Sequence, residues 1–152
     1  MHPLAFSLVV VASLAAEPKS YQAAHAQAIE NGKPILVLVG ADWCPGCRTL
    51  KQQTLPRMQQ SGKLADVEYA VVNTDRESRL ASQLMRGNSI PQLILFTRDG
   101  EVWRRGQLTG AQAESTIASF LQQSLASHSP PRPMNDAAVS QASAADETAG
   151  GR

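Results

Sequence analysis

Cys44 and Cys47 are the only two cysteines of this 152-residue chain, and two residues separate them. They come soon after the apolar run from Ile35 to Val39, which is typical of a strand covered on both faces. A Cys-x-x-Cys pair that a buried strand delivers to the start of a helix is suited to making and breaking disulfides. We therefore interpret the two thiols as a redox pair.

The residues of the motif predict different roles for the two sulfurs. Pro45 suits the first position of a helix because its φ is already helical and its missing N–H would have no partner there. Cys44 would then be the N-cap, facing unpaired N–H groups and the positive end of the helix dipole, so we expect a lowered thiol pKa and assign it as the nucleophile. Cys47, one turn further on, is expected to be more buried and to resolve the mixed disulfide.

Two other uses of such a pair are a structural disulfide and half of a zinc site. A disulfide that closes so short a loop would constrain the chain little. Zinc normally takes four ligands, and the three histidines, His2, His25 and His128, lie outside the motif. We expect no metal and no bound cofactor. A module that holds Cu(I) between the two thiolates stays open as an alternative.

Composition limits the partners further. The 14 basic and 13 acidic residues leave a net charge of +1, and no basic run flanks aromatic residues, so no nucleic acid partner is expected. No Gly-rich phosphate loop or Ser-His-Asp set stands out. The length suits one domain with one core.

The two ends of the chain differ from its middle. The apolar run from Leu4 to Ala16 is too short to span a bilayer comfortably but suits a signal peptide, although no Lys or Arg precedes it. We predict a leader over residues 1–16, a folded domain over 17–126 and a disordered tail rich in Pro, Ser and Ala over 127–152. The protein is accordingly expected to be periplasmic or secreted, or membrane-anchored if the leader is not cleaved.

Apolar periodicity in the middle of the chain predicts an alternation of helices and strands. The predicted helices span about Tyr21–Glu30, Cys44–Thr54, a further piece over Arg57–Leu64, a helix that follows Asp75, has Leu80–Met85 on its apolar side and is closed by Gly87, and Ala113–Leu125. The predicted strands span Ile35–Val39, Val67–Val72, Leu93–Phe96 and a short stretch around Val102–Trp103. We expect Ser20 to cap the first helix, Leu55-Pro56 to bend or end the second, and Thr109 with Gln112 to form a capping box before the last.

This order of elements predicts the topology of the sheet. A right-handed crossover makes the first two strands parallel. The hairpin at Asp99-Gly100 adds an antiparallel pair on the other side of the first strand. The expected fold class is α/β, with a four-stranded mixed sheet and helices on both faces.

From about Ser20 to Ala126 the chain resembles the thioredoxin superfamily, which implies a thioredoxin-like fold. The resemblance rests on Ala41-Asp42-Trp43-Cys44-Pro45-Gly46-Cys47-Arg48 at the strand-to-helix junction, on Ile90-Pro91, and on the Asp99-Gly100 hairpin. The Ala-Asp-Trp-Cys-x-x-Cys motif is more similar to exported thioredoxin-like domains, such as the C-terminal domain of the membrane disulfide reductase DsbD, than to cytosolic thioredoxin.

The resemblance implies which residues meet the substrate. Trp43, Pro45 and Gly46 would line the surface around the nucleophile. Pro91 would be cis and packed beside the cysteines, which leaves the backbone of Ile90 free to pair with an extended substrate peptide. From the sequence alone, Trp43 is equally compatible with a core position, and most prolines at the start of a strand are trans.

Two positions depart from cytosolic thioredoxin. Leu38 replaces a buried Asp that assists proton transfer with the resolving thiol, and Val71 replaces the Lys that accompanies it. Proton removal from Cys47 must then rely on water or on another group. Asp42 is given no catalytic role, because an anion near Cys44 would oppose formation of its thiolate.

These observations lead to the hypothesis of an exported thiol-disulfide oxidoreductase of the protein-disulfide reductase type. Its partners would be protein disulfides and a membrane-linked thiol electron donor, and the chain is expected to be a monomer. A disulfide oxidase or isomerase is the alternative among enzymes, because the Pro45-Gly46 dipeptide does not reveal the redox direction.

Overall fold

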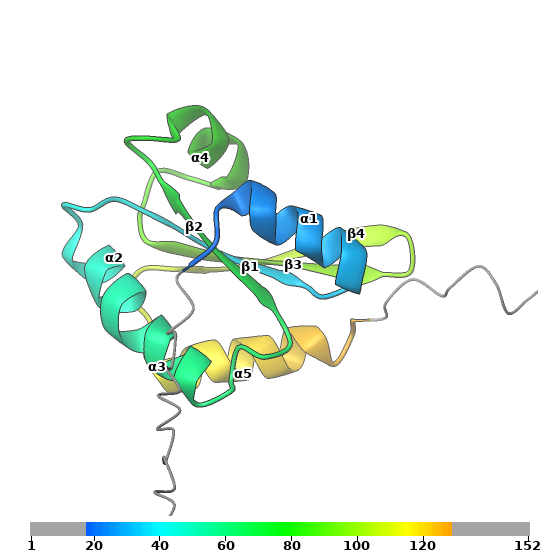
Figure 1. The fold of residues 1–152 in the computed structure, drawn as a ribbon. Coiled ribbons are helices and arrows are strands. Elements are labelled where there is room, and N and C mark those ends of the chain that lie inside the picture. Colours follow the sequence, from blue (N-terminus) through cyan, green and yellow to red (C-terminus); the bar gives the residue numbers. More distant parts are fainter. Residues whose placement is uncertain (1–17, 129–152) are drawn as a thin grey trace, which may run out of the picture.

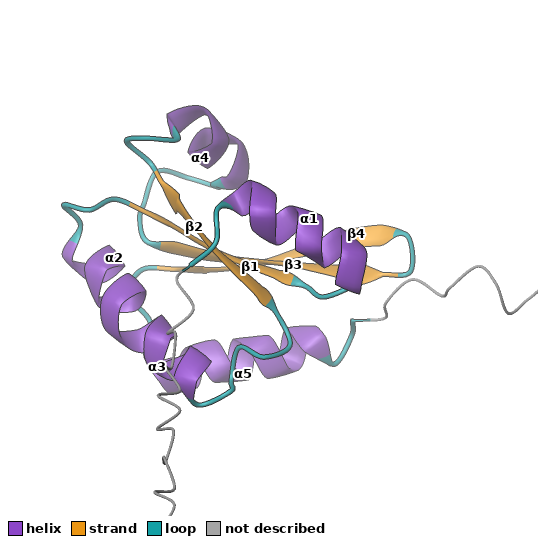
Figure 2. Ribbon diagram, in the orientation of Figure 1, coloured by secondary structure: helices purple, strands orange, loops and turns teal. Residues whose placement is uncertain are grey.

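The computed structural model describes residues 18–128, in which helices cover both faces of a central sheet (Figure 1, Figure 2). The helices are α1 (Tyr21–Asn31), α2 (Pro45–Thr49), α3 (Leu55–Gln60), α4 (Ser78–Leu84) and α5 (Glu114–Leu125), and a π-helical segment (Leu50–Thr54) joins α2 to α3. The strands are β1 (Ile35–Gly40), β2 (Glu68–Asn73), β3 (Gln92–Asp99) and β4 (Val102–Thr109).

The strand order in the sheet is β2-β1-β3-β4. β1 runs parallel to β2 and antiparallel to β3, and β3 pairs antiparallel with β4. All six residues of β1 are buried, as its uninterrupted apolar run predicted. The predicted fold class, a four-stranded mixed sheet with helices on both faces, is confirmed.

Side chains alternate along the strands between two apolar layers. One layer, which includes Val37, Val39 and Ile94, packs against α1 and α4. The other, which includes Leu36 and Leu93, packs against the α2–α3 region and α5. Figure 2 shows the same division, with α1 and α4 on one side of the sheet and the remaining helices on the other.

The first helix begins and ends as predicted. The Ser20 hydroxyl accepts a hydrogen bond from the Ala23 N–H at 3.2 Å, which satisfies one of the free donors of the first turn. Gly32 ends the helix with φ of 73°, a left-handed conformation that glycine adopts without a Cβ penalty.

The helix that begins at the cysteines continues past Leu55-Pro56 instead of ending there. Pro56 has no N–H to donate and would clash in a regular turn. The preceding turn is widened into the π-helical segment, whose last bond runs from the Leu55 N–H to the Leu50 carbonyl. α3 then ends at Gln60, so the helical piece predicted to reach Leu64 is shorter.

The hairpin is longer than predicted, and the predicted capping box is wrong. β4 extends to Thr109, which pairs with Gln92 of β3 and is therefore a strand residue. The N-cap of α5 is Ala113, whose side chain makes no capping bond, while the Gln112 amide donates to the Thr109 carbonyl at 2.8 Å. β4 is an edge strand with mostly exposed or half-exposed residues, so its apolar pattern is weak.

Residues just after α5 contact the body of the domain. The His128 Nδ1 accepts from the Arg98 N–H at 3.1 Å, and its Nε2 donates to the Gly32 carbonyl at 3.0 Å. The leader predicted over residues 1–16 lies outside the described residues, as does the predicted tail beyond His128. Within residues 18–128, none of the helices has the length and apolar character needed to cross a membrane.

Candidate active site

The strand β1 delivers the cysteines to the first turn of α2, where they are joined by a disulfide. Cys44 is the N-cap, with extended backbone angles, and Pro45 holds the first helical position, as predicted. The Cys47 N–H points at the Cys44 Sγ, 3.3 Å away. When the disulfide is reduced, this donor and the helix dipole favour a thiolate at Cys44.

The two cysteines are buried to nearly the same degree. Cys44 is 6% exposed and Cys47 is 4% exposed, so the expectation of a distinctly more buried Cys47 has little support from the oxidised pair. The difference between them lies in the helix terminus, which faces Cys44. The assignment of Cys44 as nucleophile and Cys47 as resolving thiol stays a prediction.

Two glycines let other parts of the chain approach the disulfide closely. A Cβ on Gly40 would lie 2.7 Å from the Cys47 Sγ, so β1 passes directly against that sulfur. A Cβ on Gly46 would lie 3.1 Å from the Ala111 Cβ and 3.5 Å from the Pro91 Cδ. Pro91 therefore lies beside the first turn of α2.

The loop before β3 reaches the cysteines as the resemblance implied. The Ile90-Pro91 peptide bond is cis. The Ile90 side chain packs against the small apolar cluster formed by Ala41, Cys44 and Cys47. The structure thus brings the predicted residues Pro45, Gly46, Ile90 and Pro91 together around the disulfide. Their role in binding substrate stays a prediction.

Trp43 is a surface residue, which excludes a core position. Its side chain is 66% exposed, and its Nε1–H donates to the Asp75 Oδ2 at 3.0 Å. The indole forms one wall of an open groove, and Ile90 lies on the same groove. The other lining residues come from the segment before α4, from α4 and from the loop after it: Thr74, Ser78, Ala81, Ser82, Met85, Gly87 and Asn88.

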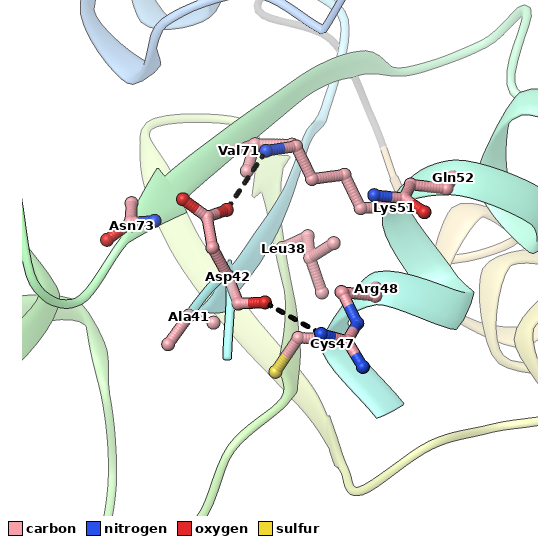
Figure 3. A pocket seen from close by; sticks show the side chains of 10 residues that line it. Leu38, Ala41, Asp42, Cys47, Arg48, Lys51, Gln52, Val71 and Asn73 are labelled. Carbon is pink, nitrogen blue, oxygen red and sulfur yellow. Dashed lines mark hydrogen bonds and ion pairs between the residues drawn. The ribbon is translucent and has the colours of Figure 1, made fainter. Parts of the chain in front are cut away.

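A second pocket, of about 150 Å³, lies beside Cys47, between α2 and the sheet (Figure 3). Leu38 and Val71, which are register partners on β1 and β2, form its apolar part. Asp42, Arg48 and Lys51 line it as well. The two positions that depart from cytosolic thioredoxin therefore face each other across neighbouring strands and make this wall of the pocket apolar.

Asp42 is engaged by cations. Its carboxylate lies 2.8 Å from the Arg76 Nη2 and 3.5 Å from the Lys51 Nζ, and Figure 3 shows it turned toward Lys51. Its carbonyl accepts from the Arg48 Nη1 at 3.5 Å. Sequence reasoning missed the Asp42–Arg76 and Trp43–Asp75 contacts, since no local spacing connects residues so far apart along the chain.

Glu68 has a shifted pKa and lies at the end of the sheet away from the cysteines. Burial alone would raise the pKa of Glu68, but hydrogen bonds from Lys19 and Asn31 and the charges of Lys19 and Lys33 hold that pKa below its usual value. Glu68 pairs with Ile35 at the start of β1, whereas the cysteines follow the end of β1. Among residues 18–128, no group of three or more His, Cys, Asp or Glu side chains is placed to hold a metal ion.

Residues 21–124 match a family model described as a thioredoxin-like domain. The chain is 33% identical over 99 residues to thioredoxin 1 of Synechococcus elongatus, covering 65% of this chain and 87% of that one. It is 26% identical over 100 residues to the thiol:disulfide interchange protein DsbD of Shigella boydii, covering 64% of this chain. The match spans 18% of the length of that DsbD.

The fold itself is similar to solved thioredoxins. The solution structure of a thioredoxin from Thermus thermophilus superposes with a TM-score of 0.61 at 22% identity, covering 72% of this chain and 88% of that one. A disulfide-bonded Cys-x-x-Cys pair in such a fold supports thiol-disulfide oxidoreductase activity. With the family model matched over most of the folded region, this chain belongs to the thioredoxin-like family.

Proposed function

We propose that this protein is an exported protein-disulfide reductase. The observation that carries the proposal is the placement of Cys44 at the N-terminus of α2, with the Cys47 N–H directed at its sulfur. A thiolate stabilised in this way is an effective nucleophile near neutral pH. Trp43, which precedes Cys44 in the chain, and Ile90, which packs against the cysteine cluster, line one groove where a polypeptide carrying the target disulfide has room to bind.

The reaction uses the two sulfurs in sequence. The Cys44 thiolate attacks one sulfur of the substrate disulfide, and the other substrate sulfur leaves as a thiolate and takes up a proton. Cys47 then loses its proton and attacks the Cys44 Sγ, which releases the second substrate thiol. Two electrons have passed to the substrate, and the enzyme is left with the Cys44–Cys47 disulfide seen here.

A thiol donor must reduce this disulfide before the next turnover. We propose a membrane-linked donor, and the similarity to the thiol:disulfide interchange protein DsbD supports it. Export is supported by the apolar run from Leu4 to Ala16. Cell fractionation tests this part: the full-length protein is expected outside the cytoplasm, and recovery only with the cytoplasmic fraction would refute export.

An insulin reduction assay with dithiothreitol as donor tests the activity and the order of attack. Cys44→Ser is expected to abolish turnover and to form no adducts. Cys47→Ala is also expected to lose turnover, but it should retain substrate proteins covalently through Cys44. Adducts formed through Cys47 in the Cys44→Ser variant, and absent from Cys47→Ala, would reverse the assignment.

The equilibrium of the Cys44–Cys47 pair with glutathione tests the direction of the reaction. A reduction potential well below that of the surrounding compartment is expected for a reductase. A potential well above it would identify a disulfide-forming oxidase instead. The alanine variant of Ser119, an exposed residue of α5, serves as a control that should match the wild type in both assays.

A further inference from the structure

The loop between α4 and β3 forms part of the groove beside the disulfide. It contributes Gly87, Asn88 and Ile90 to the groove lining, and it has no regular secondary structure. Gly87 has a φ of 77°, which marks a turn that few other residues would allow. Backbone groups in such a segment need partners outside a helix or ladder to hold one conformation.

Gln92 supplies these partners. It is the first residue of β3, directly after Pro91, and its side chain is fully buried. The Oε1 accepts from the Arg86 N–H at 3.2 Å, and the Nε2 donates to the Arg86 carbonyl at 3.0 Å and to the Ser89 carbonyl at 2.9 Å. Both ends of the amide are thus used, and all three bonds go to the loop.

The backbone of Gln92 is meanwhile held by the sheet. It lies opposite Val39 of β1 and Thr109 of β4. Its side chain shares the sheet face of Ile94, in the apolar layer beneath α1 and α4. A buried amide in such surroundings is unfavourable unless its hydrogen bonds are made, so the loop and the amide stabilise each other in one arrangement.

We propose that Gln92 is a positioning residue for polypeptide substrates. By fixing Arg86 and Ser89 against the sheet, it sets where Ile90 lies relative to Trp43 across the groove. Loss of its bonds loosens the surface that a polypeptide contacts, but leaves Cys44 at its helix terminus. This inference rests on the proposed function and specifies it: Gln92 determines the binding of protein disulfides and not the reactivity of the thiols.

The test compares two substrates of different size in variants of Gln92. Gln92→Met keeps the length of the side chain and removes all three bonds. The KM for insulin is expected to rise about tenfold, while kcat and the rate of reduction of a small disulfide, hydroxyethyl disulfide, stay within about twofold of the wild type. Thr97→Val is the matched control, since Thr97 is also a buried polar residue of β3 but lies far along the strand from the loop.

Hydrogen exchange supplies a second measurement that does not depend on turnover. The Arg86 amide donates to Gln92 in the wild type and is expected to lose protection in Gln92→Met, while the Ile94 amide in the strand keeps it. Gln92→Glu retains the acceptor for this amide but loses both donors. It should give an intermediate KM for insulin, and it serves as the test if the Met variant does not fold.

The outcomes separate this inference from the proposed function. If the wild type fails to reduce insulin, the proposed reductase activity fails. If the wild type reduces insulin but Gln92→Met and Gln92→Glu have the same KM for insulin as the wild type, only the positioning role is overturned. A parallel fall in the rates with insulin and with the small disulfide would also overturn it, because that result would mean that Gln92 supports the cysteines themselves.

Discussion

Replacing Gly40 with alanine tests the close approach of β1 to the Cys47 sulfur. The added Cβ would lie 2.7 Å from the Cys47 Sγ and 2.9 Å from the Cys47 Cβ. The φ of Gly40 is not positive, so the substitution introduces steric overlap without backbone strain. All of its effect should therefore pass through Cys47 and the first turn of α2.

The size of the effect follows from the overlap. Ordinary contacts of a Cβ begin at 3.4 Å, so the strand or the sulfur must shift by the difference from 2.7 Å, about 0.7 Å. Overpacking of this kind costs about 1–3 kcal/mol, which lowers the melting temperature of a domain this size by about 4–15 °C. Displacing an attacking atom by close to 1 Å slows its reaction by up to about 100-fold, so insulin turnover should fall by about 10-fold to 100-fold.

Thermal melts of both redox forms and insulin turnover measure this prediction, with Gly106→Ala as the matched control. A Cβ on Gly106 would lie 2.9 Å from the ring of Phe120, but the end of that ring can move aside. The control should cost less than about 1.5 kcal/mol and keep full activity. Wild-type stability and turnover in Gly40→Ala would refute the reasoning, as would an equal loss of activity in Gly106→Ala.

Two further predictions concern side chains around the sheet. The pKa of Glu68 is lowered by folding, so its contribution to stability is full above its unfolded pKa of about 4.5 and is lost as the pH falls through the folded value. Glu68→Gln should therefore lower the free energy of unfolding by about 1–3 kcal/mol at pH 7, where Lys19 donates to the carboxylate. Urea melts should show that this difference between variant and wild type shrinks in acid. A difference that does not depend on pH would contradict the prediction. Asp75→Ala removes the acceptor of the Trp43 indole, so acrylamide should quench Trp43 fluorescence more strongly in a Trp103→Phe background, with little change in stability; unchanged quenching would show that the bond does not hold the ring.

The parts of the fold that the sequence predicted are those with strong local signals. The uninterrupted apolar run of β1 requires cover on both faces, and it lies in the middle of the sheet. Ser20 and Gly32 mark the ends of α1 through their own side-chain and backbone chemistry. Cys44 and Pro45 likewise mark the start of α2. In each case the information lies within a few residues of the feature.

The errors arose where distant contacts overrode the local signal. Thr109 and Gln112 have the spacing of a capping box, but pairing with β3 keeps Thr109 in the strand. Leu55-Pro56 was expected to bend or end a helix, and α3 does begin at Leu55, but the π-helical segment that joins it to α2 and the complete burial of Leu55 were not predicted. Neither outcome depends on propensity alone.

The candidate site shows the same difference between features with a local signal and features that depend on distant contacts. Its reactive pair was identifiable from spacing, and the resemblance to a family supplied Ile90 and Pro91. The contacts that surround the pair could not be identified from the sequence, because they join residues far apart along the chain. The bonds of Gln92 to the loop are an example: Gln92 reads as the polar first residue of a strand, and only the tertiary structure turns its amide toward Arg86 and Ser89.

The surroundings of the two sulfurs also give a physical reason for the order of attack. Cys44 faces the N-terminus of α2, which favours its thiolate. Cys47 is buried to nearly the same degree as Cys44, but it lies within α2 instead of at its N-cap, and the pocket beside it has an apolar wall formed by Leu38 and Val71, which favours a neutral thiol. Asp42, the carboxylate that lines this pocket, is turned toward cations. We therefore predict that Cys47 gives up its proton to water or to another group only after Cys44 has captured the substrate.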